Sequence, residues 1–238
     1  MLDTNPRYRV VTSEDQRTGR PRAMDVDSAA AAVPPASTPP PPNAIAPAEA
    51  LKRIMDGNAR YAANAPSERD FSSGRAARVL GQHPIAAILS CADSRVAPEP
   101  AFDQGPGDLF VVRVAGNIVN QDLLASLEYG VEFLGVPLIM VLGHTGCGAV
   151  DAAIKVLKAK VVLPGHLPEL IAAIKPAVIL AAKTQTGSLH DNAITENVRR
   201  QVARLKTSRP VVQKLYVAKK IDIVGGVYDL ATGKIALV

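Results

Sequence analysis

The 238-residue sequence contains no tryptophan, and aromatic residues make up only 4% of it. Its hydrophobic fraction is nevertheless 47%, so the core must consist mainly of Ala, Val, Leu and Ile. These side chains are typical of a buried parallel sheet with Ala-rich helices packed on it. The composition therefore favours an α/β protein.

Cysteine is also scarce, since Cys91 and Cys147 are the only two. A secreted protein held by disulfides would normally carry more cysteines in a shorter chain, although one bridge between these two remains open. Each cysteine follows an apolar run and lies among small and polar residues. This placement favours a chemical role over a structural bridge.

The chain has no run of about 18 apolar residues, so we expect no membrane-spanning helix. The polar N-terminus does not resemble a signal peptide, and a cytoplasmic location is expected. The formal net charge of +5 is scattered, with its densest cluster at Lys214, Lys219 and Lys220. Nucleic-acid binding would require a denser basic stripe with interleaved aromatics, so no such partner is expected.

The first 43 residues differ from the rest in composition. Residues 29–42 read AAAAVPPASTPPPP, and proline at this density prevents regular helix or sheet. We therefore predict a disordered tail or linker over 1–43, with a docking arm as the alternative, and a folded domain over 44–238.

Apolar patterns in the folded part predict alternating strands and helices, and hence a mainly parallel α/β sheet flanked by helices. Residues 228–238 resemble a hairpin that turns at Thr232 and Gly233. Strands are predicted at 85–90, 109–114, 137–142 and 215–227. Helices are predicted at 48–63, 122–134, 149–160, 167–183 and 192–205, with a loop and short helix at 67–81.

Two polar motifs directly follow predicted strands. SCADSR at 90–95 follows the first strand, and GHTGCG at 143–148 follows the third. Ligand sites in open α/β sheets lie beyond the carboxyl ends of the strands. If the two motifs form one site, these strands are neighbours, which predicts the strand order 2-1-3-4 plus the C-terminal edge hairpin.

Cys91, His144 and Cys147 together offer two thiolates and an imidazole, a standard ligand set for Zn²⁺. Three protein ligands leave the fourth tetrahedral position open, as in catalytic zinc sites, although Asp93 could close it. Cys147 precedes a predicted helix, whose N-terminal N–H groups and positive dipole favour a thiolate. The sequence therefore predicts one zinc ion per chain.

The chain resembles the β-class carbonic anhydrases over roughly residues 47–238. The resemblance is carried by CADSRV at 91–96, PGDLFVVR at 106–113, EYGV at 128–131 and HTGCG at 144–148. It implies a zinc lyase in which zinc hydroxide attacks carbon dioxide to give bicarbonate and a proton. It also implies a dimer, or a tetramer built from dimers, with the site at the subunit interface.

The resemblance further implies roles for individual residues. Arg95 would hold Asp93 away from zinc, so that Asp93 orients the zinc-bound water, and the absence of tryptophan favours this open, water-bound form. Gln82, Phe110 and Tyr129 match positions that line the carbon dioxide pocket. From the residues alone, Phe110 and Tyr129 would be interpreted as core and Gln82 as solvated.

Two other functions remain open at this point. The same zinc site could hydrolyse carbon disulfide or carbonyl sulfide, because such enzymes differ in access to the pocket and not in ligands. Alternatively, the chain could be a zinc-stabilised, non-catalytic dimer module with Asp93 permanently on the metal. His83 and His190 are possible proton carriers, although a lone histidine is more often a plain surface residue.

Overall fold

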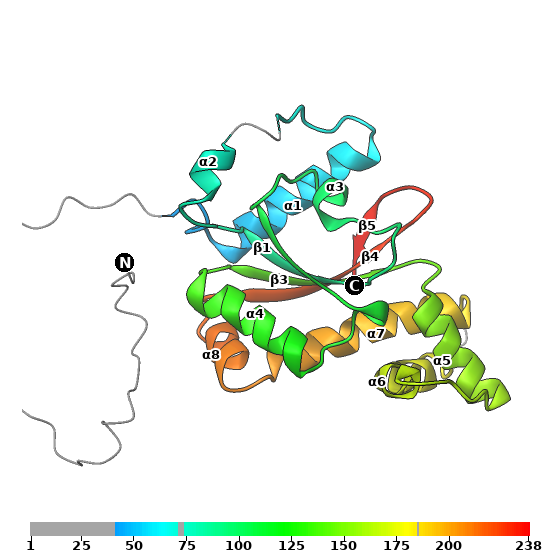
Figure 1. Cartoon of the computed structure of the whole chain (residues 1–238). Coiled ribbons are helices and arrows are strands. Elements are labelled where there is room, and N and C mark those ends of the chain that lie inside the picture. The colour runs from blue at the N-terminus through cyan, green and yellow to red at the C-terminus, as the bar shows by residue number, and fades with distance from the viewer. Residues whose placement is uncertain (1–40, 71–73, 185) are drawn as a thin grey trace, which may run out of the picture. The chain divides into compact units, whose positions relative to one another are not determined.

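A computed structural model describes residues 41–70, 74–184 and 186–238. Residues 1–40 of the predicted tail lie outside the described residues. The described part is built around a five-stranded sheet (Figure 1). Its strands are β1 (Ala86–Ser90), β2 (Leu109–Arg113), β3 (Leu138–His144), β4 (Asp222–Tyr228) and β5 (Ile235–Leu237).

The strand order is β2-β1-β3-β4-β5, with β5 antiparallel to β4 and the other pairs parallel. This confirms the predicted order 2-1-3-4 and the C-terminal hairpin. Ser90 pairs with both Arg113 and Leu142, so the carboxyl ends of β1, β2 and β3 meet at one edge of the sheet. Both sequence motifs begin at that edge.

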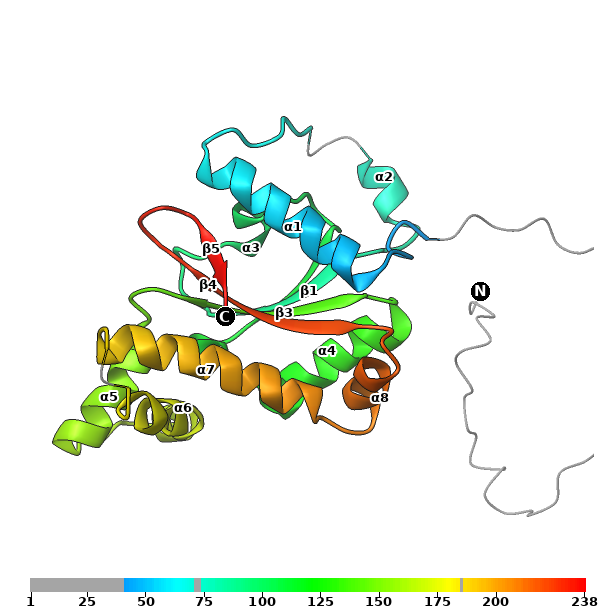
Figure 2. The ribbon, with the colours of Figure 1, turned by 180° about the vertical axis from the view of Figure 1, so that it is seen from behind.

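Helices cover both faces of the sheet. In Figures 1 and 2, α1 and α3 lie on one face, while α4, α7 and α8 lie on the other. The helices are α1 (Pro47–Ala62), α2 (Arg75–Arg78), α3 (Pro98–Ala101), α4 (Gln121–Phe133), α5 (Gly148–Ala159), α6 (Leu167–Ala181), α7 (Leu189–Lys206) and α8 (Val211–Val217). A 3₁₀ turn, η1 (Ala115–Asn117), follows β2.

Alternation along the strands explains their unbroken apolar sequences. Ile88 and Met140 pack in the cluster that includes α1, whereas Leu89 and Val141 pack on the opposite side with α4, α7 and α8. Because each face is covered, both sets of side chains are fully buried. A strand buried on both faces needs apolar residues at every position.

The predicted strand over residues 215–227 is wrong in its first part. Residues up to Val217 belong to α8, and β4 begins only at Asp222. Val212 is buried and Leu215 packs partly buried beside it, three residues further on, as on one face of a helix. Short apolar runs do not separate helix from strand by periodicity alone, and here the helical packing prevails.

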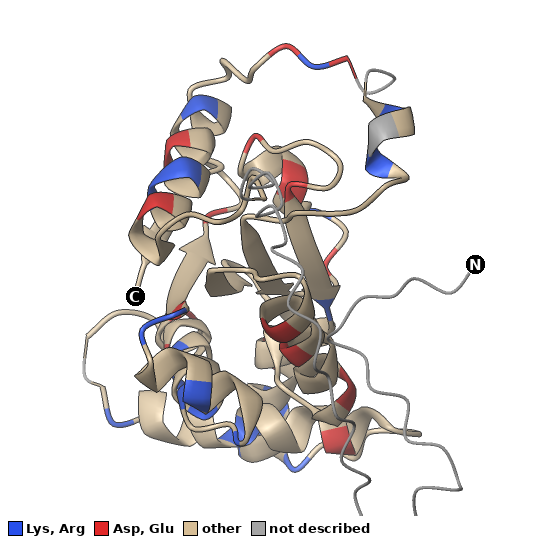
Figure 3. Ribbon diagram, turned by 90° about the vertical axis from the view of Figure 1, so that its left-hand side faces the viewer, with Lys and Arg blue, Asp and Glu red and all other residues tan. Residues whose placement is uncertain are grey.

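The outer faces of the helices are polar in places and apolar in others. On α1, Lys52 pairs with Asp56 and Arg53 with Glu49, each one helical turn apart (Figure 3).

Among the described residues, no helix combines the length and the apolar character needed to cross a membrane.

Candidate metal centre

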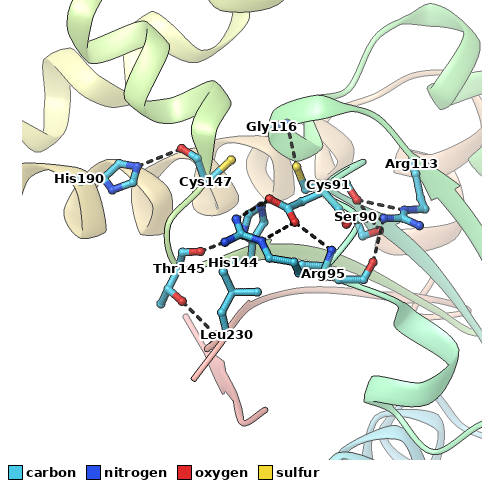
Figure 4. A network of polar contacts seen from close by, with 12 residues as sticks. Ser90, Cys91, Arg95, Arg113, Gly116, His144, Thr145, Cys147, His190 and Leu230 are labelled. Atoms are coloured by element: carbon cyan, nitrogen blue, oxygen red, sulfur yellow. Dashed lines mark hydrogen bonds and ion pairs between the residues drawn. The ribbon is translucent and has the colours of Figure 1, made fainter. Parts of the chain in front are cut away.

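Cys91, His144 and Cys147 meet at the carboxyl edge of the sheet (Figure 4). Cys91 directly follows β1, His144 is the last residue of β3, and Cys147 is the N-cap of α5. Because β1 and β3 are hydrogen-bonded neighbours, the two motifs converge. The potential ligand atoms of the three residues all lie within 4.8 Å of one another.

His144 is held in the orientation that a metal ligand needs. Its Nδ1 lies 2.9 Å from the carbonyl oxygen of Thr145, and a carbonyl only accepts, so Nδ1 carries the proton. When the ring is neutral, its lone pair is therefore on Nε2. That nitrogen is buried, and among the described atoms it has no hydrogen-bond partner. An unpaired buried nitrogen is costly unless another group, such as a metal ion, binds it.

The two sulfur atoms share an environment that favours negative charge on Cys91. A hydrogen bond with the Cys147 thiol lowers the pKa of Cys91 to about 4 against the opposing effect of burial, and His144 and the Gly116 N–H add to this. The Gly116 nitrogen lies 3.3 Å from Cys91 Sγ. The same contact with Cys91, together with burial, raises the pKa of Cys147. The contact between the two sulfurs thus favours ionisation of Cys91 and disfavours ionisation of Cys147.

Asp93 lies at the open side of the cluster and is held by Arg95. The Arg95 Nε and Nη2 atoms donate to the two carboxylate oxygens at 2.9 and 2.7 Å, and the Arg95 backbone N–H donates at 3.0 Å. The Arg95 guanidinium holds the pKa of Asp93 well below its usual range, although partial burial opposes this. Asp93 Oδ2 lies 3.9 Å from His144 Nε2, so the carboxylate faces the metal-binding atoms.

Arg113 fixes the backbone that carries Cys91 and Asp93. Its Nε donates to the Cys91 carbonyl at 3.0 Å, and its Nη2 donates to the carbonyls of Asp93 and Val96, each at 2.8 Å. Sequence reasoning assigned Arg113 no role. The available signal was a charged residue at the end of an otherwise apolar strand.

His190 also contacts the centre through a ligand backbone. Its Nε2 lies 3.0 Å from the carbonyl oxygen of Cys147 (Figure 4). The sequence suggested His190 only as a possible proton carrier. The structure places it on the first turn of α7, where it contacts the backbone that enters α5.

Gln82, Phe110 and Tyr129 are not brought to the metal-binding atoms within one chain. Gln82 is exposed in the loop before β1, and the rings of Phe110 and Tyr129 lie beside each other at 6.4 Å. Phe110 pairs with Ala87, four residues before Cys91, which separates their backbones by about 13 Å along the strands. A single chain therefore assembles the metal-binding trio with Asp93 and Arg95, but not the three residues expected to line the pocket.

Comparison with known proteins gives consistent results. A sequence model described as carbonic anhydrase matches residues 86–235. The carbonic anhydrase of Mycolicibacterium smegmatis is 39% identical over 192 residues, covering 80% of this chain and 93% of that protein. Carbonic anhydrase 2 of Mycobacterium tuberculosis is 38% identical, covering 80% and 92%.

Solved structures extend the similarity to the fold. The β-carbonic anhydrase CcaA matches with a TM-score of 0.61 and 27% identity, over 79% of this chain and 94% of that chain. The Coccomyxa β-carbonic anhydrase, solved with acetazolamide, matches with a TM-score of 0.63 and 29% identity, over 79% and 86%. With the family match, the extended identity and the shared fold together, the chain belongs to the β-carbonic anhydrase family.

Proposed function

We propose that this protein interconverts carbon dioxide and bicarbonate, with release of a proton, at a zinc ion held by Cys91, His144 and Cys147. Its family makes it a carbonic anhydrase, a lyase that hydrates carbon dioxide reversibly. The observation that supports the proposed site is the buried trio of ligand atoms, in which His144 Nε2 has no other partner in the described part of the chain.

The trio fits zinc in chemistry and in size. Two thiolates and one imidazole are a usual set for Zn²⁺, with bonds of about 2.3 Å to sulfur and about 2.0–2.1 Å to nitrogen. Ligand atoms within 4.8 Å of one another are close enough for one such ion to bridge with small adjustments.

Both cysteines are free thiols, which favours a reducing compartment and supports the cytoplasm as the proposed location.

Zinc, when bound, supplies a Lewis acid that makes water nucleophilic near neutral pH. The chain's own residues then set where that water lies. Asp93 Oδ2 faces the space beside His144 Nε2 and can accept a hydrogen bond from the attacking water. Because Arg95 occupies both carboxylate oxygens, Asp93 stays in place as an acceptor instead of becoming a fourth ligand. This supports an open site.

The substrate pocket is proposed to be completed by a second copy of the chain. Gln82, Phe110 and Tyr129 would supply an amide and aromatic walls suited to a small apolar substrate. Tyr129 is 42% exposed and Phe133, beside it, is 41% exposed, so this aromatic surface is available to a partner. A self-associated dimer, or a tetramer built from dimers, would let these residues from one subunit face the metal of the other.

Metal analysis combined with carbon dioxide hydration kinetics tests the proposal. We expect one zinc per wild-type chain and hydration that chelation removes. Cys147→Ser should lose most of both, because a hydroxyl is a poor replacement for a thiolate on zinc. Lys158→Ala, an exposed change on the same helix, is the matched control and should retain both.

Two results would contradict the proposal. A folded protein with one zinc per chain but no hydration between pH 7 and 9 would indicate a non-catalytic module. Rapid hydrolysis of carbonyl sulfide or carbon disulfide without hydration of carbon dioxide would indicate the related hydrolase. Both substrates should therefore be assayed on the same zinc-loaded sample.

A further inference from the structure

The turn η1 supplies a hydrogen bond to the Cys91 sulfur through an unusual backbone conformation. Gly116 has φ +74°, and its N–H points at Cys91 Sγ from 3.3 Å. A Cβ at this position would lie 2.5 Å from the Ile174 side chain, so no larger residue fits without displacement. The direction of this N–H thus depends on what holds the turn in place.

Two buried amides on α7 bind the backbone of the turn and of the segment that follows it. Asn197 Nδ2 donates to the Gly116 carbonyl at 2.8 Å, and Gln201 Oε1 accepts from the Val119 N–H at 3.0 Å. Gln201 Nε2 also donates to Asn197 Oδ1 at 3.3 Å, which links the two side chains. Asn197 is 1% exposed and Gln201 is 4% exposed.

At these buried positions, an apolar side chain would be buried at a lower free-energy cost than an amide. Burying an amide is unfavourable unless its hydrogen bonds are made, and both side chains direct theirs to residues 116–119 or to each other. They lie four residues apart and therefore on the same face of α7. Their hydrogen bonds end on the segment that contacts the sulfur, not on a neighbouring helix.

The same helix also contacts the backbone beside the other two ligands. Next to His144, Gly143 is so close to Val198 that a Cβ there would lie 2.6 Å from its methyl group. Next to α5, His190 is bonded to the Cys147 carbonyl. Helix α7 therefore touches the backbone at or near each of the three ligands.

We infer that Asn197, supported by Gln201, is a positioning residue for the metal centre, because it holds Gly116 where its N–H donates to the Cys91 thiolate. An N–H···S bond withdraws charge from the sulfur and fixes its direction, so it tunes both affinity and electronic structure of a bound metal. The inference rests on the proposed metal site.

Two nearly isosteric variants test it: Asn197→Leu and Gln201→Met. The matched control is Asn192→Ala, which removes an amide on the same helix that donates to the Thr186 carbonyl at 2.7 Å. Zinc affinity is measured by competition with a chelator. The sulfur-to-metal charge-transfer band is measured in the cobalt-substituted protein, and the folded state by circular dichroism.

We expect Asn197→Leu to weaken zinc binding about 10- to 100-fold and to move the cobalt band to longer wavelength. Gln201→Met should show the same changes at smaller size, and Asn192→Ala should show neither. If Asn197→Leu yields no folded protein, Gln201→Met decides by the same readouts.

Folded variants with wild-type affinity and an unmoved band would overturn the inference. Weaker binding with an unmoved band would also overturn it, because that indicates general loosening and not a lost bond to sulfur. Failure of the proposed function looks different, because it appears in the wild type itself, which would then bind no zinc or would not hydrate carbon dioxide when loaded with zinc.

Discussion

Asp93 lies between the Arg95 guanidinium and the three metal-binding residues. The guanidinium donates to both carboxylate oxygens, while the nearest ligand nitrogen is 3.9 Å from Asp93 Oδ2. A planar fork matches a carboxylate in a way that a lysine ammonium does not. The state of the site therefore depends on one side chain that does not touch the metal-binding atoms.

We expect Arg95→Ala to lower kcat for hydration by about 100-fold while zinc content stays near one per chain, because Asp93 is then free to leave its position or bind the metal. Arg95→Lys should be only a partial rescue. Stopped-flow kinetics and metal analysis check this. Arg53→Ala on α1 is the control, and equal rates in Arg95→Ala and the control would refute the role given to Arg95.

Asp103 is a second carboxylate whose ionised form the fold favours. Burial opposes its ionisation, but hydrogen bonds from Arg60, Ser67 and Arg69 outweigh burial and lower the pKa of Asp103 to about 2. Arg60 Nε lies 2.6 Å from one carboxylate oxygen, and Ser67 Oγ lies 2.7 Å from the same oxygen. These bonds join α1 and the segment after it to the end of α3.

Since this pKa is below the unfolded value of about 3.9, the carboxylate stabilises the fold above that pH. The contribution should be lost as the pH falls from about 4 toward 2. We expect Asp103→Asn to lower the free energy of unfolding by roughly 1–2 kcal/mol at pH 7, after allowing for solvent screening near Arg60.

Urea unfolding of wild type and Asp103→Asn across pH 7 to 3 measures the difference in their free energies of unfolding. This difference should become smaller as the pH falls. Metal release in acid affects both proteins, so only their difference is informative. Asp56→Asn, in an exposed pair on α1, should change stability less at every pH. A gap that stays constant with pH would contradict the assignment.

At the scale of elements, α1 approaches α3 so closely that one glycine sets the distance. A Cβ at Gly57 would lie 1.8 Å from the carbonyl oxygen of Phe102, which is backbone and cannot rotate away. Alanine normally stabilises a helix relative to glycine by about 1 kcal/mol. Here the contact outweighs that preference.

We therefore expect Gly57→Ala to destabilise the protein by about 2 kcal/mol or more, measured by urea unfolding of the zinc-loaded protein. Gly81→Ala is the matched control, because its Cβ would be 3.6 Å from the His83 side chain, an ordinary van der Waals contact and the nearest one among the described residues. If Gly57→Ala unfolds at the wild-type urea concentration, the described packing of α1 on α3 is incorrect.

Much of the element order was predictable because the central strands β1 and β3 are buried on both faces. Unbroken apolar runs gave β1, β2 and β3, and the two motifs after β1 and β3 required these strands to be neighbours. The error at 215–217 arose where the same apolar pattern suits a helix. Tertiary packing, which the local pattern does not contain, decided that segment.

At the scale of the whole molecule, contacts between distant segments were beyond sequence reasoning. Arg113, Asn197 and Gln201 bind backbone groups 17 to 82 residues away, and a backbone group carries no side-chain signature. Cys91 and Cys147 could be singled out because thiols are rare in this chain and follow strands. Amides and arginines are common, so their roles emerge only from the fold.

The separation of Phe110 and Tyr129 from Cys91 leads to a prediction about the assembly. In a shared site, one subunit supplies the metal and the other supplies the aromatic wall. Cys147→Ser then removes the metal half of a site, and Tyr129→Ala removes the aromatic half. In a two-fold dimer that pairs one Cys147→Ser chain with one Tyr129→Ala chain, both substitutions fall in the same site. The remaining site then has wild-type composition.

Mixing these two weakly active variants, after exchange of subunits, should therefore restore hydration above the sum of the separate samples. Light scattering before and after mixing verifies that both variants form the same oligomer. Mixing Cys147→Ser with Arg95→Ala is the control. Both substitutions affect the metal half of a site, so a mixed dimer of these variants contains no site of wild-type composition. In that mixture each site pairs a damaged metal half with an intact wall, so no restoration is expected. If the Tyr129→Ala mixture also stays at the sum of its parts, the metal and the aromatic wall do not come from different subunits.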